Sequence, residues 1–290
     1  MNRKNEQSMI PLKDLNLTNR FLFAEVMEDS QTQRDVLSII FGREIPILRK
    51  AETEKEVRLS PMIRSVRLDM FSVDEEQNVY NTEMQDRWKK DLAKRSRYYQ
   101  ALMDTSLLQP GILDYSCLNN TFFIMIMTFD LFGYGKYQYT FQAKCEEVPD
   151  LYLKDGAVRI FLNTHGENED EVSEELVDFL RYVENTTDDT VERMESERIK
   201  RIHKRVCEVR ASEEIGVKYM QAWEERYYDK LEAQEEGRAE GRAEGQKAGK
   251  EQINELNRRL LEDNRIEDLK KAVLDMEYQQ KLLEEYGLQN

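Results

Sequence analysis

The chain has 290 residues, of which 40% are hydrophobic and 35% are charged. This length allows one core of about 150 to 200 residues with an appendage, but it excludes three full domains. Gly and Pro are scarce, so the composition favours a helix-rich globular protein over a disordered one. No apolar run approaches the roughly 18 to 20 residues that a membrane span needs, and the first residues lack the apolar core of a signal peptide. We therefore expect a cytoplasmic protein with no membrane partner.

The cysteines and histidines form none of the common metal or disulfide motifs. Cys117, Cys145 and Cys207 are far apart and odd in number, which argues against a disulfide framework and a paired-cysteine zinc site. His165 and His203 lie outside any HExxH pattern, so the sequence also argues against a zinc hydrolase.

The net charge of −15 is unevenly distributed along the chain. A negative total argues against a nucleic-acid partner, because phosphate binding needs a basic surface. Residues 1–165, however, contain 22 Lys and Arg against 24 Asp and Glu, whereas the remaining residues contain 21 against 34. The acidity therefore belongs to the C-terminal part, and the N-terminal part remains a candidate for DNA binding.

Residues 12–165 predict one domain, preceded by a flexible polar leader over residues 1–11. Apolar residues at helical spacing predict helices over 17–29 and 34–42. Thr18 is a candidate N-cap for the first of these helices, and Asn19 competes for that role.

Two strands follow, over residues 64–73 and 79–85. They flank the polar stretch DEEQN, which is typical of a β-hairpin with a five-residue loop. If the strands pair symmetrically about this loop, Val73 faces Val79.

The middle of the chain predicts one more helix and three strands. An amphipathic segment over about 88–108 ends at a proline and a glycine, which stop a helix. Residues 121–129 are almost wholly apolar, as in a central strand that is buried on both faces. The last strands are predicted over 137–143, where alternation suits a sheet edge, and over 158–164.

An all-helical extension is predicted from residue 166. Within 166–235, one apolar helix face contains Leu176, Phe179, Leu180 and Val183. Residues 236–250 repeat Gly-Arg-Ala-Glu units, which we interpret as a marginal, solvated helix or tether. Residues 251–290 predict a hairpin of two short helices, with Asn264 and Glu267 as a capping box between them. A continuous coiled coil is the alternative for this last segment.

The most informative pattern is the pair of carboxylates in the hairpin. The register that pairs the two valines also places Asp69 opposite Glu83, and alternation puts Gln85 on the same face as Glu83. Mg²⁺ binds to one or two carboxylates together with water and phosphate oxygens, and it can activate water for attack on a phosphodiester. The alternative is that these are ordinary charged residues on a half-solvated hairpin face.

The most basic window follows directly, over residues 86–100. Its cationic side chains could hold a DNA backbone, or they could form a solvated helix face. A third interpretation is that Arg95 packs under the sheet with Tyr98 and Tyr99. The candidate DNA-binding residues are Arg87, Lys89, Lys90, Lys94, Arg95, Arg97 and Tyr98.

These segments together resemble the recombination-promoting nuclease family, bacterial PD-(D/E)XK proteins often described as transposases. The likeness covers roughly residues 12–235 and rests on RSVRLDMFSVDEEQNVYNTEMQ, LAKRSRYYQALMD, LLQPGILDYSCLNNTFFIMIM and VRIFLNT. It implies a restriction-endonuclease-like α/β fold, a mixed sheet flanked by helices, and a DNA endonuclease of low sequence specificity that is linked to recombination or mobile elements. It also implies that Asp69 and Glu83 bind Mg²⁺, or Mn²⁺ or Ca²⁺, and that Gln85 takes the place of the lysine in the superfamily name.

One departure from the family concerns the first helix. Members often have an Asp-x-x-Phe-Lys pattern there, whereas this chain has Arg20 and Ala24 at the two polar positions. Glu25 is a candidate replacement carboxylate. The alternative function is therefore a catalytically decayed DNA-binding or scaffolding protein, and in either case the helical tail is a candidate for homo-oligomer formation.

Overall fold

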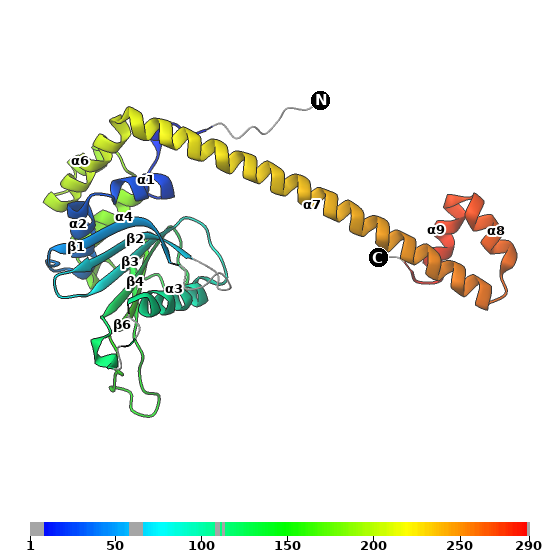
Figure 1. Ribbon diagram of the computed structural model, residues 1–290, viewed down its shortest axis with the longest axis horizontal. Helices are drawn as coiled ribbons and strands as arrows, with labels where there is room; N and C mark the ends of the chain where they lie inside the picture. Colours follow the sequence, from blue (N-terminus) through cyan, green and yellow to red (C-terminus); the bar gives the residue numbers. More distant parts are fainter. Residues whose placement is uncertain (1–8, 58–65, 108–110, 112–113, 289–290) are drawn as a thin grey trace. The chain divides into compact units, whose positions relative to one another are not determined.

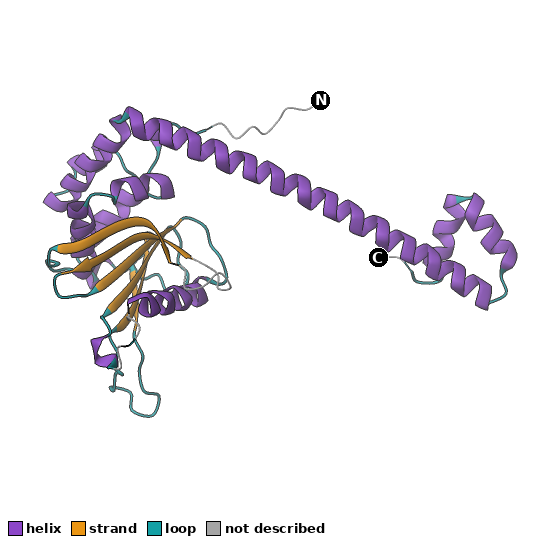
Figure 2. Cartoon of the chain, in the orientation of Figure 1, coloured by secondary structure: helices purple, strands orange, loops and turns teal. Residues whose placement is uncertain are grey.

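The computed structural model describes residues 9–57, 66–107, 111 and 114–288, which form two compact units, 1–220 and 221–290 (Figures 1 and 2). The strands are β1 (Leu48–Val57), β2 (Val66–Asp74), β3 (Val79–Gln85), β4 (Thr121–Met127), β5 (Gln138–Phe141) and β6 (Ala157–Asn163). The helices of the first unit are α1 (Arg20–Val26), α2 (Ser30–Phe41), α3 (Leu92–Leu107), α4 (Glu174–Glu184), α5 (Asp188–Glu192) and α6 (Glu197–Ala211). Helix α7 (Glu213–Glu262) begins in the first unit and continues into the second, which also contains α8 (Ile266–Leu274) and α9 (Met276–Glu285). None of the helices in this described part combines the length and apolar character that a bilayer span requires.

The strands form one mixed sheet in the order β1-β2-β3-β4-β6-β5 (Figure 2). Neighbours β1, β2 and β3 pair antiparallel, β3-β4 and β4-β6 pair parallel, and β5 pairs antiparallel with β6 at the far edge. The predicted mixed sheet with flanking helices is therefore confirmed, as are the central position of β4 and the edge position of β5.

The hairpin has the predicted register. Val73 pairs with Val79, and the paired positions continue as far as Met70 and Thr82. The turn between the strands is closed by the carboxylate of Asp74, whose Oδ1 accepts a hydrogen bond of 2.9 Å from the backbone N–H of Asn78.

Strand β4 separates two apolar cores because its side chains alternate between the faces of the sheet. Ile124 and Ile126 belong to the core beneath α1, α2, α4 and α6, whereas Phe123, Met125 and Met127 belong to a second core with Leu92 of α3 and Phe161 of β6. Helix α3 therefore covers the face of the sheet opposite to α1, α2 and α4 (Figure 1).

Several predicted helix boundaries were wrong. Of the two candidate N-caps of α1, Asn19 is the one observed, because its side chain accepts hydrogen bonds from the N–H groups of Phe21 and Leu22. Helix α2 begins four residues earlier than predicted, after Asp29 caps it through the N–H of Thr32. Helix α3 begins at Leu92 rather than near residue 88, and the segment before it is irregular. The predicted end of this helix near residue 108 lies outside the described residues.

Strand β1 is not predicted by the sequence pattern. Its residues, LRKAETEKEV, are mostly charged or polar, since an edge strand needs to bury only part of its surface. One of these charged side chains still packs on the sheet, because the Lys55 Nζ lies 3.4 Å from the centre of the Phe71 ring.

The C-terminal region is helical, as predicted. The apolar face of α4 is buried, which confirms the expected orientation of Leu176, Phe179, Leu180 and Val183. Residues 236–250 lie within the continuous helix α7. A Cβ added at any of the four glycines there would meet no atom within 4 Å apart from the neighbouring backbone of α7 itself: Gly237, Gly241, Gly245 and Gly249.

The second unit has a small apolar core of its own. Leu256 and Leu260 of α7 pack with Ala272 of α8 and with Leu282 and Leu283 of α9.

The division of the chain into five segments at residues 11, 165, 235 and 250 stays a prediction.

The predicted capping box in the second unit is wrong. Asn264 has a φ of 59° and follows the end of α7. The cap of α8 is Arg265, which makes no side-chain capping bond in the described structure. The left-handed conformation of Asn264 ends a helix instead of starting one.

Candidate active site

The two predicted carboxylates lie together where β2 and β3 stop pairing through their backbones. The backbone N–H of Asp69 donates to Glu83 Oε1 at 3.2 Å. Across the hairpin, the N–H of Met84 donates to Asp69 Oδ2 at 3.1 Å. At these two positions a side-chain carboxylate accepts the hydrogen bond of a backbone N–H, in place of a carbonyl oxygen of the neighbouring strand. These bonds hold both carboxylates against the sheet.

An arginine from a different helix neutralises each carboxylate. Arg20, the first residue of α1, places its Nη2 2.6 Å from Asp69 Oδ1. Arg95 of α3 donates from Nη2 to Glu83 Oε2 at 3.0 Å. The site is therefore bounded by α1 and α3 as well as by the two strands.

Burial strongly perturbs both acids, since Asp69 and Glu83 are each only 1% exposed. The pKa of Glu83 is raised to about 8, mainly because burial removes solvent from the carboxylate and secondly because Asp69 repels its charge. The attraction of Arg95 lowers the pKa and offsets part of this rise. Burial likewise raises the pKa of Asp69, although Arg20 opposes the shift. Two acids this close titrate as a coupled pair, and perturbed carboxylates of this kind are typical of functional sites.

The donor atoms fit a hard divalent cation. Asp69 Oδ1 is buried without accepting a hydrogen bond in the described structure, although it is ion-paired to Arg20. The amide oxygen of Asn81 is also buried without a partner there, and the amide nitrogen of the same residue donates to Glu83 Oε1 at 3.2 Å. Carboxylate and amide oxygens are the ligands that Mg²⁺, Mn²⁺ and Ca²⁺ prefer. Asp69 and Glu83 are therefore the residues that would hold such an ion.

Gln85 is tied to the same cluster. Its Oε1 accepts from Arg95 Nη1 at 3.1 Å, and its Nε2 donates to the carbonyl oxygen of Arg87 at 2.5 Å. Arg95 thus bridges Glu83 and Gln85. The Arg95 guanidinium also lies 5.0 Å from the centre of the Tyr99 ring, which helps to orient it.

The predicted DNA-binding residues fall into two groups. Arg95 is largely buried, with 24% of its side chain exposed, and points into the carboxylate cluster. The others are exposed, three in the irregular segment before α3 and three on α3: Arg87, Lys89, Lys90, Lys94, Arg97 and Tyr98. The first of these exposed residues, Arg87, lies two positions after Gln85, the last residue of β3.

Glu25 lies in different surroundings. Its carboxylate forms an ion pair with Lys218 of α7, and its backbone carbonyl accepts a hydrogen bond from Arg205 of α6. Within the described part of the chain, no hydrogen bond or ion pair links Glu25 to Asp69 or Glu83.

Arg20 and Asn81 also belong to the site, although the sequence patterns did not single them out. For Asn81 a signal existed, because it is two residues before Glu83 on the same strand and so shares its face. For Arg20 the only sequence signal was its place in the first-helix pattern, since the packing of α1 against β2 cannot be read from local sequence.

One comparison with known proteins identifies the family of this chain. The family model described as PD-(D/E)XK nuclease family transposase matches residues 44–237, which is more than half of the chain. No significant match was found among curated proteins or solved structures. The matched segment contains the whole sheet together with Asp69, Glu83, Gln85 and Arg95. The chain therefore belongs to the PD-(D/E)XK nuclease family transposases.

Proposed function

We propose that this protein is a metal-dependent DNA endonuclease with its active site at Asp69 and Glu83. Membership of the family indicates a nuclease-like function, and PD-(D/E)XK nucleases generally use divalent metals. The observation that carries the proposal is the contact between the two buried acids, in which the Asp69 N–H donates to Glu83 Oε1 while both pKa values are raised. Such a pair is costly for folding alone, because two carboxylates lose their hydration on burial even though Arg20 and Arg95 offset their charge, but it is suited to a cation.

Each residue of the site has a distinct task in this proposal. Asp69 and Glu83 would hold Mg²⁺, and the chemistry gained when the ion is bound is activation of water and stabilisation of negative charge on the phosphate. Arg95 orients Glu83 through a hydrogen bond of 3.0 Å and favours its ionised form. Gln85 is a neutral group whose amide can donate to water or to a phosphate oxygen without adding charge.

DNA is the substrate class that a nuclease family implies. The exposed cations that follow β3 support binding to the phosphate backbone: Arg87, Lys89, Lys90, Lys94 and Arg97. Contacts to phosphates position a protein on DNA but do not read its sequence. We therefore propose cleavage with low sequence specificity and a role in recombination or in the movement of mobile elements.

Nicking of supercoiled plasmid tests the proposal. Wild type should cut in Mg²⁺ or Mn²⁺ and not in EDTA, and both Asp69→Asn and Glu83→Gln should abolish cutting. Asp86→Asn is the matched control, because Asp86 follows Gln85 directly but is exposed, so the same change of charge there should leave the rate within about twofold of wild type. Equal cutting by wild type and Asp69→Asn would reject the assignment of the site.

The second candidate is a DNA-binding or scaffolding protein with a decayed site. The observation in its favour is that Arg20 already occupies one oxygen of Asp69, at 2.6 Å. It predicts salt-sensitive DNA binding without cutting in any divalent metal.

Homo-oligomer formation through the C-terminal helices is a separate proposal, which is compatible with both functions. The second unit exposes Val273, Leu274 and Met276, which are 68%, 89% and 84% accessible, and exposed apolar side chains of this kind favour association. Light scattering on wild type and on Val273→Glu with Leu274→Glu tests it, since only the wild type should exceed the monomer mass.

A cytoplasmic location stays a prediction.

A further inference from the structure

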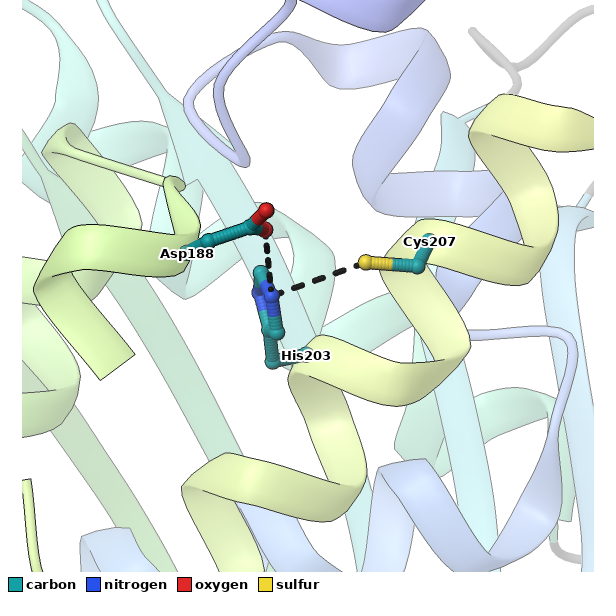
Figure 3. Close-up of side chains that lie close together, drawn as sticks. All are labelled: Asp188, His203 and Cys207. Atoms are coloured by element: carbon teal, nitrogen blue, oxygen red, sulfur yellow. Dashed lines mark hydrogen bonds and ion pairs between the residues drawn. The ribbon is translucent and has the colours of Figure 1, made fainter. Parts of the chain in front are cut away.

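Three potential metal ligands from two helices meet away from the carboxylate pair. His203 and Cys207 are four residues apart on α6, which places them on the same side of that helix. Asp188 is the first residue of α5. Figure 3 shows the Asp188 carboxylate and the Cys207 thiol both directed at the same nitrogen of the His203 ring. Asp188 Oδ1 is 3.0 Å from His203 Nε2, and Cys207 Sγ is 3.5 Å from it.

We propose that Asp188, His203 and Cys207 bind a transition-metal ion of the zinc type. A tetrahedral Zn²⁺ with ordinary bond lengths to nitrogen, sulfur and oxygen needs donor atoms that are about 3.3 to 3.6 Å apart. The three donor atoms lie within 4.8 Å of one another, and two of the separations are already close to that range. Binding then requires only small rotations of the Asp188 and Cys207 side chains.

The orientation of His203 supports the proposal. Its other ring nitrogen, Nδ1, lies 2.9 Å from the hydroxyl of Tyr182 on α4. Tyr182 is fully buried and the His203 side chain is only 14% exposed, so packing holds the imidazole in place. In metal sites a histidine typically hydrogen-bonds through the nitrogen that does not bind the ion, which fixes the ring and its tautomer. Tyr182 provides that partner here.

A surface ion pair between Asp188 and His203 would be the simpler explanation. It accounts for the contact at Nε2, but it does not account for the thiol of Cys207 on the same nitrogen. The side chain of Asp188 is 80% exposed, so an ion has access from solvent, and water can fill the fourth ligand position. Three protein ligands and one water form a common zinc arrangement.

The donor set separates this site from the carboxylate pair. Imidazole and thiolate favour zinc-like ions, whereas oxygen donors favour Mg²⁺, Mn²⁺ and Ca²⁺. The proposal therefore does not depend on nuclease activity. A bound ion would link the start of α5 to α6, and α6 packs on α1 and α2 in the larger apolar core. His203 and Cys207, four residues apart on one helix, fit neither the HExxH pattern nor a paired-cysteine pattern, so neither common motif marks this site in the sequence.

Binding of Co²⁺ to the reduced full-length protein tests the proposal, because a thiolate bound to Co²⁺ gives a charge-transfer band in the near ultraviolet. Wild type should bind Co²⁺ with this band, and Zn²⁺ should displace it. Cys207→Ser and His203→Ala should each abolish the band. The control is Cys145→Ser: the Cys145 thiol contacts a single carboxylate, that of Glu147 at 3.2 Å, so the band should persist. A band that survives Cys207→Ser, or none in folded wild type, would overturn the assignment.

Two further variants distinguish this site from the carboxylate pair and from general loss of structure. Tyr182→Phe removes only the hydroxyl and should weaken Zn²⁺ binding by about 10- to 100-fold without abolishing it. Asp69→Asn should leave Zn²⁺ affinity and the Co²⁺ band unchanged. Tyr182→Phe with wild-type affinity, or an Asp69→Asn variant that loses the band, would contradict the proposal.

Discussion

Glu83→Gln is expected to change how stability depends on pH. In the folded protein the pKa of Glu83 is raised from 4.5 to about 8, first by burial and then by the neighbouring Asp69. The folded state therefore holds a proton that the unfolded state releases between these two values. Stability linked to this proton is fully present below about pH 4.5 and is lost as the pH rises toward 8.

The magnitude follows from the size of the shift. A difference of one in pKa corresponds to about 1.4 kcal/mol, so the change from 4.5 to about 8 sets a loss of up to about 5 kcal/mol. For a protein with a core of this size, 1 kcal/mol corresponds to about 2 to 4 °C in Tm. The wild type should therefore lose up to about 10 to 20 °C in Tm across this range through Glu83. Glu83→Gln, which cannot ionise, should lose much less.

Calorimetry of the full chain in EDTA, at one-unit steps from pH 5 to 9, is the assay. EDTA keeps divalent cations away from the carboxylates, so only protons are varied. Asp86→Asn serves as the control, because Asp86 is exposed and its removal should leave the slope unchanged. Parallel Tm curves for wild type and Glu83→Gln would refute the argument that burial of this carboxylate dominates.

Three more predictions concern the cations around the site. Arg95→Met removes the attraction that favours ionised Glu83. A rise of about one in the pKa of Glu83 should lower cleavage at pH 7 about tenfold and move the pH–rate profile to higher pH. An unchanged profile would contradict this. Arg20→Met should lower the Mg²⁺ concentration for half-maximal cleavage at pH 9, because no guanidinium then competes for Asp69, whereas a higher requirement would mean that Arg20 assists binding. The double variant Lys89→Glu with Lys90→Glu is assayed for DNA binding in EDTA. The slope of log affinity against log salt should be about 2 smaller in magnitude than that of wild type. An equal slope would mean that these lysines do not contact DNA.

The sequence predicted the parts of the fold that local patterns determine. Alternation of apolar residues and the length of the polar loop were enough to pair Val73 with Val79, and that register placed Asp69 beside Glu83. The unbroken apolar run of β4 likewise predicted a central strand, because only a strand with a core on each face needs apolar residues at every position.

Other features depend on tertiary contacts that local sequence does not encode. Strand β1 is highly charged, and its residues form a strand because they pair with β2 at the edge of the sheet. Arg95 looked like a member of a basic DNA-binding window, yet the packing of α3 turns it toward Glu83. The cap at Asn264 failed for a local reason, since asparagine suits both the start of a helix and the left-handed residue that ends one.

The hydrogen bonds from the backbone of Asp69 and Met84 to the site carboxylates couple site occupancy to strand pairing. If an ion bound at the proposed site draws Glu83 Oε1 or Asp69 Oδ2 away, the backbone N–H of Asp69 or of Met84 loses its acceptor, and the protection of that amide should fall. Hydrogen exchange at these two positions would therefore report on occupancy directly, without DNA and without turnover. The end of the hairpin would in this sense report on the occupancy of the proposed site.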